Sequence, residues 1–169
     1  YEAPTGALSA SFNTVAVHVA PGNAPGSPVH VQPFPDIRGV KIVSTALTTK
    51  PGRSSQLHVK TEEMDGRTAI LVYGGMAVDR KPRYIYRKVW QTWENFGWVM
   101  QALFNECGIV FSGRVRRTCI PDSLQKIEKF YTFTSEPLLE YIGHMFKFSS
   151  NFAAEMVFKT MAAEKTGEP

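Results

Sequence analysis

The residues LLEYIGHMFKFSSNFAAEMVFKTMA, from Leu138 to Ala162, contain two apolar stretches separated by three small polar residues. Apolar side chains recur at the spacing of one helix face in the first stretch, and they occupy nearly every side of the second. These patterns predict two helices, the second of them buried within a larger fold. Ser149, Ser150 and Asn151 form the step between the helices, so two hydroxyls and a carboxamide lie at a tight junction.

This polar step has two interpretations. Either Ser149 or Asn151 caps the second helix by accepting hydrogen bonds from the free amides of its first turn. Alternatively, the step belongs to a catalytic or binding site. A hydroxyl and an amide inside a packed body need partners, and a substrate with a catalytic lysine would supply them. The Ser-x-Asn triplet alone is weak evidence, because motifs this short arise by chance.

The composition is that of an ordinary globular protein. The chain has 169 residues, 43% of them hydrophobic and 20% charged, which is enough to bury a real core. Its net charge of +4 comes from scattered lysines and arginines, so no basic track for nucleic acid is indicated. No apolar run approaches the roughly 20 residues that cross a bilayer, and no signal peptide opens the chain. Because Tyr1 is not an initiator methionine, we expect a processed product or a fragment.

Neither a disulfide nor a metal site is indicated. Cys107 and Cys119 are expected at opposite ends of an extended segment, so a bridge between them would require the chain to fold back. We therefore expect two unpaired thiols. The four histidines lack the spacing of metal ligands, and we expect no metal and no cofactor.

The first half of the chain has the pattern of short strands separated by turns. Val15, Val17 and Val19 alternate with small or polar residues, which is the period of a strand with one buried face. Asp65-Gly66 is a hairpin-turn signal, and linkers rich in proline and glycine separate the other segments. The spacing predicts a mostly antiparallel β region. The expected strands cover residues 13–20, 29–31, 40–47, 56–61 and 68–73.

The second half changes character. The apolar spacing predicts a helix over residues 94–107 that ends at Gly108. Strands are expected over residues 109–116 and 130–134, and Ser135 is expected to cap the next helix. The change of composition near residues 86–90 indicates a domain boundary. We expect a β-rich domain over residues 1–88 and a second domain over residues 89–169.

In its motifs the chain resembles the penicillin-binding proteins of the D-alanyl-D-alanine carboxypeptidase/endopeptidase type, peptidase family S13. The helix–Ser-x-Asn–helix stretch is similar to a landmark of that family. YEAPTGALSASFNTVAVHVAPG (residues 1–22) and NFGWVMQALFNECGIVFSG (residues 95–113) resemble two others, in the family's order and spacing. The resemblance therefore covers the whole chain.

The resemblance implies an α+β fold. Part of an accessory domain, mostly antiparallel β, would be followed by the start of an α/β penicillin-binding domain, the serine β-lactamase-like fold. It also implies a serine acyl-transferase that cleaves peptidoglycan stem peptides or cross-links and is acylated by penicillin. Ser149 matches the motif serine, which would bridge the catalytic lysine and the leaving amine. Asn151 matches the motif asparagine, which would hold a substrate carbonyl.

Two further motif matches are decoys. Ser123-Leu124-Gln125-Lys126 fits Ser-x-x-Lys, but it lies in a polar connection rather than at the ordered helix start that a nucleophile needs. Lys165-Thr166-Gly167 follows the helix that Asn151 begins, roughly 20 Å away at 1.5 Å per residue, so a helix-ending role is favoured. In the family's order, the true Ser-x-x-Lys lies before Tyr1 and the Lys-Thr-Gly strand after Pro169. This chain alone is thus not expected to turn over substrate.

The expected partners are peptidoglycan peptides, β-lactams and the remainder of the same polypeptide, and the resemblance implies a periplasmic or otherwise exported protein. A rival hypothesis is a non-catalytic β-rich module that binds peptidoglycan or a protein, in which the triplet is only a cap or a relic. Trp90, Trp93 and Trp98 are expected to pack in a core, with a ligand-stacking platform as the alternative. Tyr84, Tyr86 and Arg87 could face the cleft, but nothing local in the sequence supports this.

Overall fold

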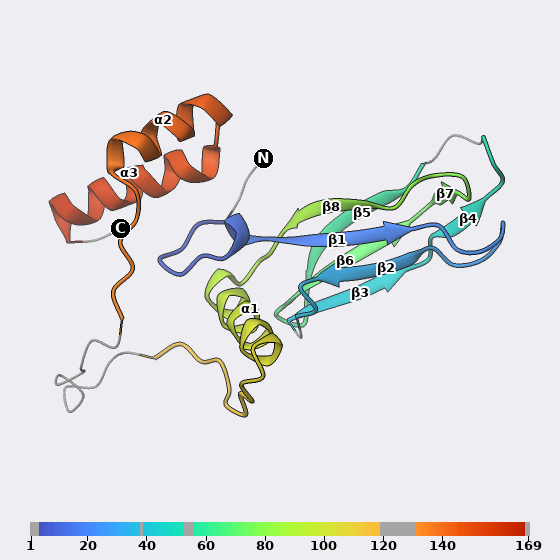
Figure 1. Ribbon diagram of the computed structural model, residues 1–169, viewed down its shortest axis with the longest axis horizontal. Coiled ribbons are helices and arrows are strands. Elements are labelled where there is room, and N and C mark those ends of the chain that lie inside the picture. The colour runs from blue at the N-terminus through green and yellow to red at the C-terminus, as the bar shows by residue number, and fades with distance from the viewer. Residues whose placement is uncertain (1–3, 38, 53–55, 119–130, 168–169) are drawn as a thin grey trace. The chain divides into compact units, whose positions relative to one another are not determined.

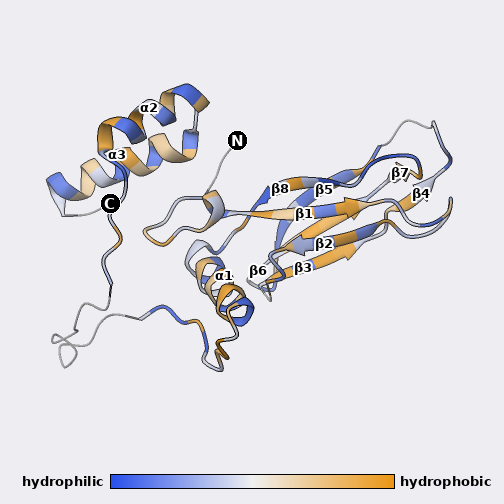
Figure 2. Ribbon diagram, in the orientation of Figure 1, coloured by the Kyte–Doolittle hydropathy of each residue, from blue (hydrophilic) through white to orange (hydrophobic). Residues whose placement is uncertain are grey.

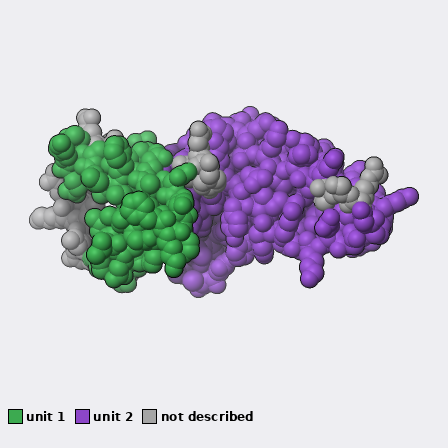
Figure 3. Space-filling model, turned by 90° about the horizontal axis from the view of Figure 1, so that it is seen from above, with its two compact units in different colours: residues 1–2, 116–169 green, residues 3–115 purple. Residues whose placement is uncertain are grey.

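The computed structural model describes residues 4–37, 39–52, 56–118 and 131–167. These residues separate into two compact units, one ending at Val115 and the other beginning at Arg116 (Figure 3). Among them, the first unit contains the strands β1 to β8 and helix α1, and the second contains helices α2 and α3 (Figure 1). The domain boundary expected between residues 88 and 89 stays a prediction.

The first sheet is antiparallel and is built around β1 (Thr14–Ala20). The strand β2 (His30–Phe34) pairs with one edge of β1, and β8 (Arg83–Lys88) pairs with the other. The valine alternation that predicts β1 is confirmed, since every second side chain of this strand is buried. The sequence analysis missed β8, and β2 extends beyond the predicted segment.

The second sheet combines a hairpin with a parallel strand. The hairpin joins β5 (His58–Met64) and β6 (Arg67–Tyr73), and β3 (Val40–Ser44) pairs with β6 in parallel. The predicted turn at Asp65-Gly66 is confirmed, because both residues have the positive φ of a two-residue hairpin turn. A separate parallel pair is formed by β4 (Leu47–Thr49) and β7 (Gly75–Ala77). The region is mostly antiparallel, as predicted.

The core lies between the two three-stranded sheets. Val15, Val17 and Val19 of β1 share one buried cluster with Ile70 and Val72 of β6. Fully burying each such side chain contributes about 1.5–3 kcal/mol relative to leaving it in water. The guanidinium of Arg87 on β8 donates to the carbonyl of Val59 on β5 at 2.7 Å, which links the two sheets at one edge. The β region is therefore a sandwich with a core of its own.

The helix α1 (Thr92–Glu106) confirms the helix predicted over residues 94–107. It packs on the sandwich core through Trp98, Val99 and Ala102, and it stops at Gly108, whose φ of 75° suits glycine. The predicted strand over residues 109–116 is wrong, because this described segment has no strand partner. Instead, the Gln101 side chain holds it by donating to the carbonyl of Phe111 at 3.0 Å.

The second unit contains α2 (Leu138–Phe148) and α3 (Asn151–Thr166), which confirm the two helices predicted around the polar step. Ser135 does not cap α2: Pro137 occupies the cap position, and the Ser135 hydroxyl donates to the Glu136 carbonyl. The strand predicted over residues 130–134 is not formed by Tyr131 to Thr134, while Phe130 lies outside the described residues. No described helix has the length and apolar character needed to cross a membrane.

Apolar side chains remain uncovered on both of these helices. Figure 2 shows apolar positions along each of them. Of the described residues of α2 and α3, only Ala153 is buried. The second helix was predicted to be buried, but among the described residues α3 is mostly exposed. The large exposed apolar side chains of the pair are Leu138, Leu139, Phe146, Phe148, Phe158 and Met161.

Candidate functional site

Ser149 occupies an unusual backbone position between α2 and α3. Its φ of 48° and ψ of 46° lie in the left-handed region, which glycine normally occupies at a helix end. The amide of Ser149 donates to the Phe146 carbonyl at 3.3 Å, and the amide of Ser150 donates to the Met145 carbonyl at 3.1 Å. This pair of hydrogen bonds is a Schellman motif, so α2 ends in a sharply defined corner.

Ser150, between the two motif residues, is the N-cap of α3. Its backbone is extended, and its hydroxyl oxygen accepts a hydrogen bond from the Ala153 amide at 3.2 Å. The polar step therefore does cap the second helix, but Ser150 provides the cap. Neither Ser149 nor Asn151, the two candidates for that role, provides the side-chain cap.

The side chains of Ser149 and Asn151 are exposed. Within the described parts of the chain, neither one takes part in a side-chain hydrogen bond. The corner therefore presents a hydroxyl and a carboxamide two residues apart, supported by a third residue that holds the backbone in place. A hydroxyl can donate and accept a proton, and a carboxamide can both donate to and accept from a peptide group.

Of the two decoy motifs, the structure describes only Lys165-Thr166-Gly167, which ends α3. Lys165 lies in the last turn of α3, and Gly167 ends that helix with a φ of 75°. The Thr166 hydroxyl donates to the Ala162 carbonyl at 2.9 Å within the same helix. The helix-ending role predicted for Lys165-Thr166-Gly167 is confirmed. The Ser123-x-x-Lys126 match lies outside the described residues.

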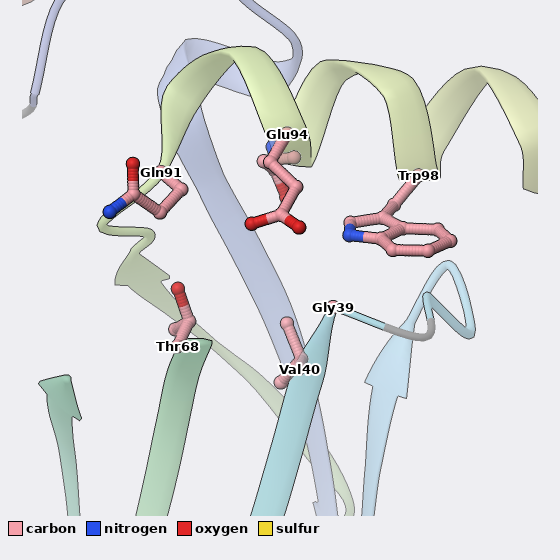
Figure 4. Close-up of a pocket in the computed structure, with 7 residues that line it drawn as sticks. Gly39, Val40, Thr68, Gln91, Glu94 and Trp98 are labelled. Atoms are coloured by element: carbon pink, nitrogen blue, oxygen red, sulfur yellow. The ribbon is translucent and has the colours of Figure 1, made fainter. Parts of the chain in front are cut away.

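A second candidate site is a small pocket at the start of α1 (Figure 4). In Figure 4 the Trp98 ring lies beside Gly39, and a Cβ atom on Gly39 would collide with it. Asn95 Nδ2 and Trp98 Nε1 are buried without a hydrogen-bond partner among the described residues. Its cavity has a volume of about 10 Å³ for the centres of water-sized molecules, which is about the room that a single water molecule needs. It is lined by Gly39, Val40, Thr68, Gln91, Glu94, Asn95 and Trp98.

This pocket suits a single small acceptor rather than a peptide substrate. Two buried N–H donors favour an oxygen atom, such as that of a carbonyl group or a water molecule. The sequence analysis missed it, because its lining comes from three separated segments. Of the predicted features, Trp98 alone lies here, and its contact with Gly39 and the core supports the packing role.

The thiol and metal predictions can be followed only in part. Cys107 is a free, exposed thiol, whereas Cys119 lies outside the described residues. No group of three histidine, cysteine, aspartate or glutamate side chains in the described ranges could hold a metal ion.

Comparison with known proteins places these features in a family. The chain matches the D-Ala-D-Ala carboxypeptidase 3 (S13) family over residues 1–169. Two structures of penicillin-binding protein 4 (dacB) from Haemophilus influenzae share its fold, with TM-scores of 0.74 and 0.71 and 20% sequence identity. The structure with the lower score was solved with a novel β-lactam.

The two matches cover 99% and 96% of this chain, respectively, but only 36% of each solved chain. This chain thus spans little more than a third of the length of the structures that it matches. A comparison with curated proteins finds no match. The family match extends over every residue, and the chain belongs to the D-Ala-D-Ala carboxypeptidase 3 (S13) family.

Proposed function

We propose that the protein to which these residues belong is a serine D-Ala-D-Ala carboxypeptidase or endopeptidase, and that Ser149 and Asn151 form one wall of its active site. The observation that carries the proposal is the corner between α2 and α3. There, Ser150 alone caps the helix, and the side chains of Ser149 and Asn151 are left exposed. The family match supplies the class of reaction.

The reaction is an acyl transfer in two steps. In the first step, a serine hydroxyl of a Ser-x-x-Lys motif attacks the carbonyl carbon of the penultimate D-alanine. An ester bond forms, the peptide C–N bond breaks, and the serine proton passes to the departing amine. In the second step, water attacks the ester, which releases the shortened peptide and returns a proton to the serine. A β-lactam would enter the first step in place of the peptide.

Ser149 is proposed to carry the proton in the first step. A hydroxyl between the catalytic lysine and the departing nitrogen can accept a proton from one and donate its own to the other. Asn151 is proposed to position the substrate, because its carboxamide can donate to a backbone carbonyl of the stem peptide. The left-handed corner supports these roles by fixing the backbone of Ser149 through two hydrogen bonds.

The remaining walls of the site are proposed to come from other parts of the polypeptide. They would include the Ser-x-x-Lys motif and a Lys-Thr-Gly strand, since Lys165-Thr166-Gly167 ends a helix here. The exposed apolar faces of α2 and α3 suit burial in such a larger domain. The proposed partners are peptidoglycan peptides and β-lactams, and the proposed compartment is the periplasm or another exported location.

Fluorescent penicillin separates this proposal from the rival of a non-catalytic β-rich binding module. The full-length protein should become covalently labelled, and replacing its Ser-x-x-Lys serine by alanine should abolish the label. The 169-residue chain alone should remain unlabelled. A properly folded full-length protein that binds cell wall but takes up no label would contradict the enzyme proposal and favour the module.

A further inference from the structure

The two outer faces of the β-sandwich differ in chemical character. The outer face of the β3-β6-β5 sheet carries charged side chains, including Lys41, Lys60 and Glu62, as expected for a face in water. A side-chain hydrogen bond with Tyr73 raises the pKa of the Lys60 amine above its ordinary value. The outer face of the β2-β1-β8 sheet carries aromatic rings instead.

These rings form one continuous surface. Phe34 on β2 and Tyr84 on β8 are 59% and 55% exposed, and their ring centroids lie 6.3 Å apart across β1. Ala16 pairs with Phe34 and with Tyr86, so its small side chain leaves room for the rings above the central strand. The ring of His18 lies 5.1 Å from that of Tyr84. Large exposed rings that lie side by side in this way mark a candidate binding surface.

The polar groups around the rings indicate what is bound. Gln32 is paired with His18 on the neighbouring strand, and His30 follows two residues before Gln32 on the same face. Lys88 lies at the end of β8 with its amine 4.6 Å from the Trp90 ring centroid. The described strands place no carboxylate on this face. Within the described strands it is therefore aromatic, rich in hydrogen-bonding groups and neutral to positive.

We propose that this face, formed by Phe34, Tyr84, Tyr86 and His18, is a binding platform for a glycan strand. A pyranose ring has an apolar face of C–H groups that stacks on an aromatic ring, and its hydroxyls need donors and acceptors at the rim. The amide of Gln32, the imidazole of His30 and the phenol hydroxyls supply these partners. This site is distinct from the corner at Ser149, and only the choice of glycan rests on the proposed function.

The experiment uses the full-length protein and peptide-free glycan strands of peptidoglycan, with a soluble tetramer of N-acetylglucosamine as a second probe. Isothermal titration should detect binding of both. Tyr84→Ala and Tyr86→Ala should each weaken it about tenfold, which corresponds to the loss of one stacked ring. Tyr84→Phe should bind within about threefold of the unchanged protein, because the ring is retained. As a control, Tyr131→Ala removes an even more exposed tyrosine that lies outside this face, and it should have no effect.

Acylation by penicillin separates this inference from the proposed function. The Tyr84→Ala and Tyr86→Ala proteins should melt normally and be acylated at the unchanged rate. The platform is refuted if neither glycan binds, or if binding survives both substitutions. Self-association of the full-length protein that Tyr84→Ala abolishes, without any glycan binding, would also refute it and identify the face as an interface between two copies. A protein that binds glycan but takes up no penicillin would contradict only the acyl-transfer proposal.

Discussion

The β-sandwich and the helix pair use apolar residues in opposite ways. In the sandwich, Val17 and Ile70 have no exposed surface, because two sheets close over them. In the helix pair, Leu139 is 81% exposed and Phe158 is 74% exposed. Exposed apolar surface of this extent is unfavourable in water unless something covers it. The sandwich therefore has its own source of stability, whereas the two helices bury few of their apolar side chains among the described residues.

The largest expected effect comes from a substitution in the sandwich core. Ile70→Ala should lower the free energy of unfolding of the 169-residue chain by about 2–5 kcal/mol, because it removes buried methyl groups and leaves a cavity. Phe158→Ala, a larger truncation on α3, should cost less than about 0.5 kcal/mol, because its ring is in solvent. Urea denaturation followed by circular dichroism measures both. Equal losses from the two substitutions would contradict the contrast between the units.

A smaller effect is expected from replacing one glycine by alanine in each of the two units. Gly39→Ala should destabilise the chain by about 1–3 kcal/mol, because the new methyl group collides with the Trp98 ring. Gly143→Ala should instead stabilise it by about 0.5–1 kcal/mol. This glycine lies inside α2, nothing lies within 4 Å of its added Cβ, and alanine is the better helix former. Thermal melts of the two variants give the signs directly. A destabilised Gly143→Ala chain would mean that α2 is packed after all.

Much of the fold could be predicted where one physical signal dominates. The alternation of Val15, Val17 and Val19 determines a strand, Asp65-Gly66 determines a hairpin turn, and Gly108 marks the end of a helix. The strand β8 was missed, although Tyr84 and Tyr86 alternate with Ile85, because its other residues are charged. The segment after Gly108 has strand composition, but strand formation also requires a partner, and composition does not reveal one.

The polar corner between two helices could be predicted from the sequence, but its geometry could not. The active-site roles of Ser149 and Asn151 stay a prediction that rests on the motif. The sequence does not show which residue is the cap, because Ser149, Ser150 and Asn151 are about equally able to fill that position. The structure assigns it to Ser150. The left-handed backbone of Ser149 was also hidden, since glycine is the residue that normally signals it. Both features depend on where α2 stops, and sequence patterns locate helix ends poorly.

The most direct test of the proposed wall compares two neighbouring serines in the complete enzyme. Ser149→Ala should slow acylation by penicillin about a hundredfold or more, since a proton-transfer group is lost, and should leave the melting temperature unchanged. Ser150→Ala should do the reverse: it should cost about 1 kcal/mol of stability by removing the cap of α3, with near-normal acylation. Wild-type acylation by the Ser149→Ala enzyme, or a loss of stability matching that of Ser150→Ala, would contradict the assignment of Ser149 to the active site.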